Sequence, residues 1–203
     1  MIAVDRDPAA VGFPLADRRA LISVEDEPQI DRLATAERVD GVIAPGIDWP
    51  VAIAARIAER TALPHPIDPA TAVLATSKLR QRERFREAGV PHPRHVVCGT
   101  PDEAAAAARS FGYPCVAKAP DRQGQKGLVL VRDEGVLGEA FGLALAESRS
   151  NVVLVEELVA GREVTVNAFS VGGHFHPLTV TDRLTAALPA FGVALTHVWP
   201  SEL

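Results

Sequence analysis

The chain has 203 residues, which is enough for one large domain or two small ones. Its composition, 47% hydrophobic and 23% charged, is that of an ordinary globular protein, and a net charge of -5 argues against a nucleic-acid-binding protein with a basic face. No secretory signal opens the chain and no apolar run approaches the roughly 20 residues of a transmembrane helix, so we expect a cytoplasmic protein without nucleic-acid or membrane partners.

The first 68 residues alternate short apolar runs with segments of helical spacing. The predicted strands are 2–4, 21–24 and 41–44, and the predicted helices are 30–39 and 51–60. Such alternation predicts a parallel sheet with helices on its faces. Because the first run leads into Asp5 without a glycine-rich turn before it, we interpret it as the second strand of a Rossmann-like sheet whose first strand and helix are missing.

A proline-rich link at 63–69 separates this α/β segment from an α+β pattern. Predicted helices begin at Asp68-Pro69, Lys78, Thr100 and Leu137, and predicted strands are 115–118, 127–131, 152–155, 164–168, 175–181 and 193–199. The adjacent Gly172 and Gly173 predict a type I′ hairpin turn. The sequence therefore predicts two domains, residues 1–68 and residues 69–203, the second of which is a helix pair plus an antiparallel sheet.

Several basic residues of the second domain are candidates for phosphate binding. Lys118 ends an apolar run, and a lysine facing a cleft there can neutralise phosphate oxygens. The turn after it contains Gln123, Gly124, Lys126 and Gly127. Backbone N–H groups of such a glycine-containing turn can close over a polyphosphate. Lys78 stands at a predicted helix start. Taken singly, an ordinary β-hairpin and a solvated surface lysine explain these residues as well or better.

The segment 151–171 places three carboxylates around a bend between apolar runs, namely Glu156, Glu157 and Glu163. Gly161 permits the bend. Adenosine binding requires an acceptor for the adenine amine, a backbone N–H for ring N1 and a carboxylate for the ribose hydroxyls. A strand that stops, exposes its backbone and resumes with a carboxylate can provide all three groups. A charged hairpin bend explains the same residues equally well when they are taken alone.

Together, and in this order, these segments resemble the ATP-grasp family. The resemblance rests on Ser77-Lys78 with the helix that follows, on Tyr113-Pro114-Cys115-Val116-Ala117-Lys118, on the loop RQGQKG, and on Val155-Glu156-Glu157-Leu158-Val159-Ala160-Gly161-Arg162-Glu163. It covers about residues 77–203 and is nearest to the carbamoyl-phosphate-synthase-like and amino-acid-ligase-like branches. Residues 1–68 resemble the αβ domain that precedes the ATP-grasp domain in this family.

The resemblance implies ATP as the cofactor and a role for each candidate residue. Lys78 and Lys118 would contact the phosphates, and the loop with Gln123, Gly124, Lys126 and Gly127 would cover them. Glu156 would accept from the adenine amine, Glu157 and Val159 would bind adenine through their main chain, and Glu163 would bind ribose. Family members activate a small carboxylate substrate as an acyl phosphate, which an amine or thiol then displaces, while lysines and magnesium neutralise charge.

The chain departs from the family in its metal ligands. An acidic residue and a Glu-x-Asn pair hold magnesium in the family's second half, whereas Asp182 and Glu202 of this chain do not have that spacing. We therefore expect a fragment truncated at both ends, without the C-terminal metal-binding half and without ligase activity of its own. A non-catalytic nucleotide-binding or regulatory fragment is the alternative.

The remaining signals are weaker. His174 and His176 share a strand face, which fits a solvated hairpin better than a metal pair, and His197 fits a packed histidine as well as a cleft residue. Asp5 lacks a preceding G-x-G-x-x-G, which disfavours a dinucleotide-binding oxidoreductase fragment. The two cysteines have no metal-ligand spacing and suit a reducing compartment.

Overall fold

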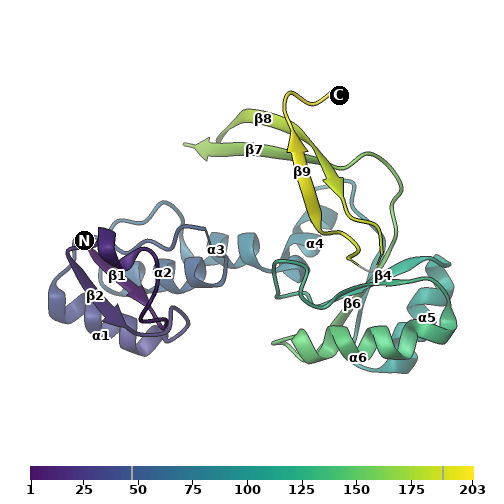
Figure 1. Cartoon of the computed structure of the whole chain (residues 1–203), viewed down its shortest axis with the longest axis horizontal. Helices are drawn as coiled ribbons and strands as arrows, with labels where there is room; N and C mark the ends of the chain where they lie inside the picture. Colours follow the sequence, from purple (N-terminus) through teal and green to yellow (C-terminus); the bar gives the residue numbers. More distant parts are fainter. Residues whose placement is uncertain (47, 189) are drawn as a thin grey trace. The chain divides into compact units, whose positions relative to one another are not determined.

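The computed structural model describes residues 1–46, 48–188 and 190–203, and the chain divides into two compact units, Met1–Arg84 and Phe85–Leu203 (Figure 1). By compactness, residues 69–84 belong with the N-terminal unit, and the division into domains at residue 68 stays a prediction. Across the described residues, no helix has both the length and the apolar character needed to cross a membrane.

The N-terminal unit contains a parallel strand pair and helices. β1 (Ile2–Asp5) pairs with β2 (Arg18–Leu21) in the register Ile2↔Arg18. The helical elements are a 3-10 turn at Phe13–Leu15, α1 (Glu27–Glu37), α2 (Asp48–Arg60), α3 (Pro69–Thr76) and α4 (Lys78–Glu87), which runs across the division between the units. Asp26 and Asp68 begin α1 and α3 because their carboxylates accept from backbone N–H groups of the first turn, where a proline also stands.

Two strands predicted for this unit differ from the structure. The strand predicted at 21–24 lies earlier, at β2, because the ladder with β1 pairs Asp5 with Leu21 and ends there. The strand predicted at 41–44 is wrong. In the described part of the chain this segment joins no sheet, and Val42 instead packs against the cluster of Ile53 and Ile57. An apolar run becomes a strand only where a neighbouring strand can take its backbone hydrogen bonds.

The second unit is built on an antiparallel sheet covered by two helices. Its strands are β3 (His95–Cys98), β4 (Cys115–Lys118), β5 (Leu128–Val131) and β6 (Val153–Glu157), in the order β3-β6-β4-β5. α5 (Pro101–Phe111) and α6 (Leu137–Glu147) pack on one face of this sheet, and a 3-10 turn at Glu134–Val136 precedes α6 (Figure 1). The predicted antiparallel sheet with helices on one side is confirmed, and β3 is a strand that the apolar pattern did not predict.

The core of this unit lies between the helices and the sheet. Small alanines of α5 and larger residues of α6 meet the inward side chains of all four strands: Ala104, Ala107, Ala108, Leu137, Ala140, Phe141, Ala144, Cys98, Cys115, Ala117, Val131, Val153 and Val155. α5 begins with the predicted capping box, in which Thr100 accepts from the Glu103 N–H and the Glu103 carboxylate accepts from the Thr100 N–H. The helix is therefore fixed where its alanine face meets the sheet.

A separate antiparallel sheet follows. β7 (Val164–Val171), β8 (His174–Thr185) and β9 (Ala194–Val198) pair in sequence order, and Gly172 and Gly173 both adopt the positive φ of the predicted type I′ turn. β8 continues to Thr185, four residues beyond the end of the strand predicted at 175–181. The bend predicted in 151–171 joins β6 and β7, which belong to different sheets, and β7 is largely exposed although its sequence is apolar.

Both cysteines lie in the core between α5, α6 and the sheet, and neither forms a disulfide. Burial raises the pKa of the Cys98 thiol from its ordinary 9.0 to about 11 and also raises that of Cys115. We expect iodoacetamide to alkylate neither thiol of the folded chain at pH 8 and both thiols in concentrated urea, as mass spectrometry can count.

Protection of the Cys98 thiol should decrease as the pH rises. Because the folded pKa of Cys98 exceeds the unfolded value, its protonated thiol favours folding below about pH 9, and this contribution is lost as the pH rises towards about 11. Protection of Cys98 from alkylation should therefore weaken over that window. Rapid alkylation of either thiol at pH 8 without urea would contradict the buried positions.

Candidate functional site

Lys118 and Glu156 lie on the sheet face opposite to α5 and α6. Side chains alternate along β4 and β6, so Ala117 and Val155 enter the core under the helices while Lys118 and Glu156 point the other way. Their ammonium and carboxylate form an ion pair, and the two side chains keep only 14% and 5% of their surface exposed. A charge pair this buried is costly to desolvate and is weak evidence of added stability, so it is a candidate for a functional role.

Glu157, the next residue, points away from that pair and is held by Arg94. Its carboxylate accepts from the Arg94 backbone N–H at 2.8 Å and from the Arg94 Nε–H at 2.6 Å, and its own N–H donates to the Arg94 carbonyl at 3.0 Å. These hydrogen bonds lower the pKa of the Glu157 carboxyl. The guanidinium of Arg94 also lies 5.2 Å from the centre of the Phe111 ring. Glu157 is thus anchored where β6 ends.

The linker between β6 and β7 carries Val159 and Gly161. It runs from Leu158 to Glu163 outside any strand, and 63% of the Val159 surface is exposed. Gly161 has a φ of 152°, where a side chain would be strained, so the predicted bend at this glycine is present. The linker therefore offers backbone groups and apolar surface beside the Lys118–Glu156 pair.

Glu163 closes the linker and pairs with Arg183 of β8. The Arg183 guanidinium donates to one carboxylate oxygen, and the Thr185 hydroxyl donates to the other at 3.4 Å. Arg183 also donates to the Gly192 carbonyl at 2.7 Å, and the Gln125 side-chain amide donates to that same carbonyl. The loop at 121–127 and the acid predicted to bind ribose are therefore joined through Arg183 and Gly192, two residues that the sequence pattern did not single out.

The loop at 121–127 is anchored at both ends and exposed at its tip. The Asp121 carboxylate accepts from the N–H groups of Arg149 and Ser150 at 3.0 and 2.7 Å, just beyond the end of α6. At the other end, a Cβ on Gly127 would come within 2.9 Å of Glu147 Cβ and 3.0 Å of Ala119 Cβ. The residues between them, Gln123, Gly124 and Lys126, are exposed. The loop is thus held at both ends and at Gln125, while its exposed residues can face a ligand.

Lys78 belongs to the N-terminal unit and begins α4. Within that unit it lies close enough to Asp48 for their charges to interact. Burial raises the pKa of the Asp48 carboxyl, and the positive charge of Lys78 opposes that shift. Lys78 is therefore partly buried and lies near the negative charge of Asp48, whereas the sequence pattern predicted a solvated surface lysine.

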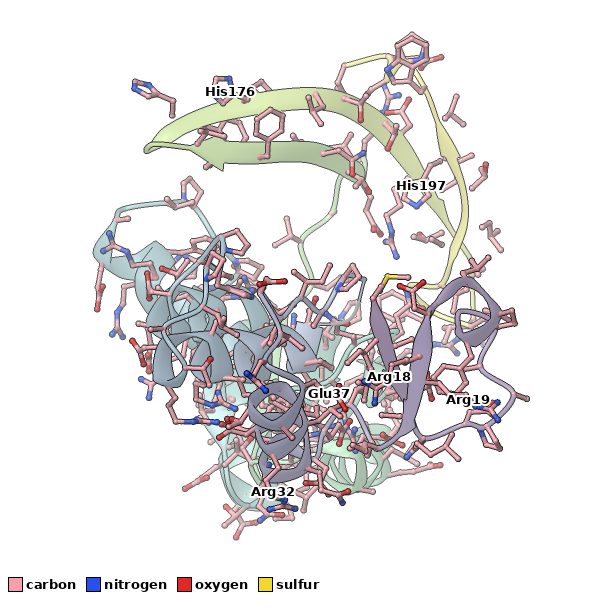
Figure 2. All side chains as sticks on the ribbon, turned by 90° about the vertical axis from the view of Figure 1, so that its left-hand side faces the viewer. Arg18, Arg19, Arg32, Glu37, His176 and His197 are labelled. Carbon is pink, nitrogen blue, oxygen red and sulfur yellow. The ribbon has the colours of Figure 1, made fainter. Side chains whose placement is uncertain are left out.

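The histidines and late acidic residues do not form a metal site. Groups of three or more His, Cys, Asp or Glu side chains that could hold a metal ion are absent from the described residues. His176 stacks on Phe169 with ring centres 5.2 Å apart, and His197 of β9 lies 3.4 Å from the Thr181 hydroxyl (Figure 2). The Arg162 guanidinium bridges Asp182 and Glu202 at 3.0 and 3.2 Å, which makes this acid pair an ion-pair cluster.

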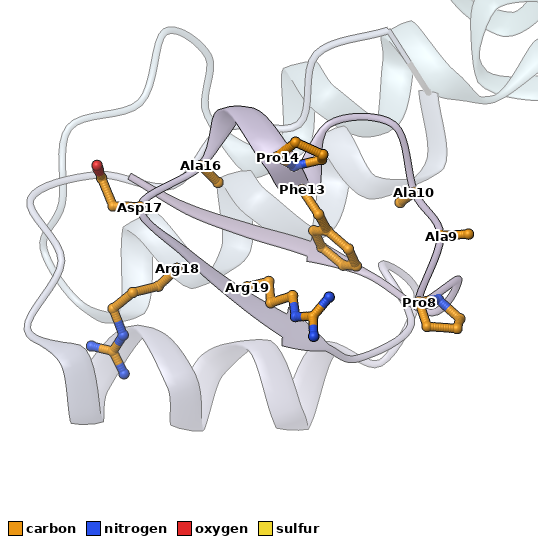
Figure 3. A pocket seen from close by; sticks show the side chains of 9 residues that line it. All are labelled: Pro8, Ala9, Ala10, Phe13, Pro14, Ala16, Asp17, Arg18 and Arg19. Carbon is orange, nitrogen blue, oxygen red and sulfur yellow. The ribbon is translucent and has the colours of Figure 1, made fainter.

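A hollow of about 410 Å³ lies in the N-terminal unit, and no predicted site residue lines it (Figure 3). Its lining is mostly proline, alanine and phenylalanine, with Asp17, Arg18 and Arg19 at its side. Arg18 is turned towards α1, where it donates to Glu37 at 2.7 Å (Figure 2). The chemistry of the candidate site is therefore in the second unit, on the strands and loops around Lys118, Glu156 and Glu163.

Comparison with known proteins shows which family this arrangement is similar to. Residues 77–169 match the family described as carbamoyl-phosphate synthase L chain, ATP binding domain. The chain is 31% identical over 153 residues to the formate-dependent phosphoribosylglycinamide formyltransferase of Burkholderia pseudomallei, an alignment that covers 74% of this chain and 38% of the relative.

Solved structures agree on the fold. The ADP complex of purK, an N5-carboxyaminoimidazole ribonucleotide synthetase, superposes with a TM-score of 0.80 at 20% identity over 100% of this chain and 51% of that one. The biotin carboxylase domain of the Hydrogenobacter thermophilus 2-oxoglutarate carboxylase gives a TM-score of 0.74 at 19% identity over 91% of this chain and 45% of that one. The chain thus spans about half or less of the proteins that it matches, and it carries a part of the ATP-grasp fold, within which residues 77–169 match the ATP binding domain of the carbamoyl-phosphate synthase L chain.

Proposed function

We propose that this chain is the ATP-binding portion of an ATP-grasp ligase. The observation that carries the proposal is the buried Lys118–Glu156 ion pair at the ends of two core strands, directly beside an exposed linker and within the segment that matches the family. A cation and an anion held side by side on an apolar face can bind a phosphate oxygen and an exocyclic amine of one nucleotide. Two solved structures with the same fold are complexes with ADP.

In this proposal each candidate residue has a role in holding ATP. Glu156 accepts from the adenine amine, and the main chain of Glu157 and Val159 binds the ring edge, since the Glu157 carboxylate is committed to Arg94. Glu163 binds the ribose hydroxyls. Lys118 and Lys78 contact the phosphates, and the loop with Gln123, Gly124, Lys126 and Gly127 closes over them. Linker and loop supply backbone groups, and the lysines supply charge.

The reaction that such a site serves is the activation of a small carboxylate as an acyl phosphate, which an amine or thiol then displaces. The residues of this chain would position ATP and neutralise the charge that develops on the transferred phosphoryl group. Magnesium is usually held by one or two carboxylates together with the phosphates of the nucleotide, and we assign no step to the metal here. Two buried thiols without a disulfide also support a cytoplasmic location.

Isothermal titration calorimetry with ATP, ADP and NAD tests the proposal. We expect ATP and ADP to bind and NAD not to bind. Lys126→Met should weaken ATP binding about 5- to 10-fold, because it removes a charge near the phosphates, and should leave adenosine binding unchanged. Arg132→Gln is the matched control, because Arg132 is exposed and has no hydrogen bond or ion pair in the described part of the chain.

Two results would contradict the proposal. Absence of ATP binding in the wild-type chain is one, and preferential binding of NAD is the other. Phosphate release in the presence of carboxylates and amines then distinguishes a ligase from a chain that only binds nucleotide.

A further inference from the structure

Arg183 is the residue that joins the two halves of the candidate nucleotide site. Its guanidinium donates to the Glu163 carboxylate and, at 2.7 Å, to the Gly192 carbonyl, while its backbone N–H donates to the Glu163 carbonyl at 2.8 Å. Only 21% of the Arg183 side chain is exposed, whereas 52% of the Glu163 side chain is exposed. A shielded arginine therefore fixes an acid that would otherwise move freely at the end of a linker.

From this geometry we infer that Arg183 is a positioning residue for ribose. It holds the Glu163 carboxylate in place for the ribose hydroxyls and ties that carboxylate to the loop at 121–127 through Gly192 and Gln125. The inference rests on the proposed function, because it deepens the role of the same site. Arg183 does not itself contact ribose in this account.

The Glu163 carboxylate has enough acceptor positions to bind Arg183, Thr185 and the ribose of a nucleotide at the same time. An ionised carboxylate has about four acceptor positions on its two oxygens. Arg183 uses one oxygen and Thr185 the other, so each oxygen keeps capacity for one ribose hydroxyl. The two protein partners also fix the orientation of the carboxylate before a ligand arrives, which removes part of the entropy cost of binding.

The hydrogen bond from Arg183 to the Gly192 carbonyl also links Glu163 to the loop at 121–127. The Gly192 carbonyl accepts from both Arg183 and Gln125, and Gln125 belongs to the tip of the loop whose ends are anchored near Asp121 and Gly127. Gly192 itself has a φ of 79°, at which a side chain would be strained, and a Cβ there would also require Leu128 Cδ2, 2.9 Å away, to shift. The position of the loop tip and the position of Glu163 are therefore set by one shared carbonyl.

The test measures discrimination between ATP and 2′,3′-dideoxy-ATP, which differ only in the ribose hydroxyls. For the wild-type chain we expect ATP to bind about 10- to 100-fold more tightly, as hydrogen bonds to a charged group provide. Glu163→Gln should reduce this ratio to near one. Arg183→Gln should reduce it about 3- to 10-fold, and Arg183→Lys should reduce it less, because lysine keeps a charge beside Glu163 without the guanidinium fork.

The ratio of the affinities for ATP and 2′,3′-dideoxy-ATP distinguishes a loss of ribose positioning from partial unfolding and from the loss of a positive charge. Loss of a positive charge or partial unfolding weakens both nucleotides equally and leaves the ratio unchanged. The Arg132→Gln control should keep the wild-type ratio, and the double variant Glu163→Gln/Arg183→Gln should discriminate no less than Glu163→Gln alone. Protection of Cys98 from alkylation checks that each variant is folded, and Arg183→Lys decides the test if Arg183→Gln does not fold.

The outcomes distinguish this inference from the proposed function. If the wild-type chain binds ATP with a ribose preference and the Arg183 variants keep or raise the ratio, the positioning role is overturned. If the wild-type chain binds both nucleotides equally, Glu163 does not hold ribose and the inference fails while ATP binding stands. If ATP does not bind at all, the proposed function fails, and the inference fails with it.

Discussion

Replacing Glu156 by alanine should lower the free energy of unfolding of the second unit by about 3–5 kcal/mol, because it leaves the Lys118 ammonium buried without its counterion. Only 14% of the Lys118 side chain is exposed, and its register neighbour is the buried Leu154. Water reaches only this small exposed part of the lysine and cannot fully replace the lost carboxylate. Urea unfolding followed through alkylation of the core thiols Cys98 and Cys115 reports on this unit alone.

The double variant Lys118→Met/Glu156→Leu separates stability from function. Because it replaces both charges by apolar groups of similar size, its free energy of unfolding should lie within about 1 kcal/mol of the wild type or above it. Its affinity for ATP should nevertheless fall at least about 100-fold, since two charge-assisted hydrogen bonds are removed. A double variant that binds ATP as the wild type does would remove this ion pair from the nucleotide site.

Local sequence signals predicted the sheet of the second unit well. β4, β5 and β6 are short apolar runs, and β4 and β6 are largely buried on both faces while β5 is partly buried, so length and apolar content identify them. β3 was missed because HVVC offers only two β-branched residues between a proline-rich turn and Gly99. The helix cap that follows directly at Thr100 is the signal that could have located its end.

Long-range pairing explains what the sequence pattern could not predict. The run at 41–44 has strand composition but joins no sheet in the described part of the chain, and a pattern cannot supply the neighbour that a strand needs. β7 alternates like a half-buried strand yet is largely exposed. The pairing of Glu163 with Arg183 depends on the β7–β8 register and on a loop that returns to Gly192, so only coordinates reveal it.

For the site residues too, the sequence predicts their positions in the chain, whereas their contacts follow from the fold. Lys118 and Glu156 could be named from their positions at strand ends, but their mutual ion pair requires the antiparallel β4–β6 register. Glu157 was expected to act through its backbone, and its hydrogen bonds to Arg94 give a physical reason for that expectation. Gly127 was chosen as part of a phosphate loop, and its packing against α6 is a second reason for glycine that needs no ligand.

That packing predicts different effects for two glycines of one loop. Gly124 and Gly127 both adopt positive φ, 62° and 67°, so alanine strains the backbone by about 1–2 kcal/mol at either position. Only at Gly127 would the new Cβ meet other atoms, Glu147 Cβ at 2.9 Å and Ala119 Cβ at 3.0 Å, whereas nothing lies within 4 Å at Gly124. Overpacking adds about 1–3 kcal/mol, so Gly127→Ala should cost about 3 kcal/mol in total and Gly124→Ala about 1 kcal/mol.

Urea unfolding monitored at Cys98 and Cys115 measures both variants under the same conditions, and Gly124→Ala serves as the control for backbone strain. Equal losses of stability would contradict the close packing of Gly127 against α6. ATP titration of the folded variants then shows which part of the loop contacts the nucleotide. If Gly124→Ala weakens ATP binding while keeping the unit stable, the tip contacts the ligand, and Gly127 is the hinge that holds that tip against the sheet because no side chain fits between Ala119 and Glu147.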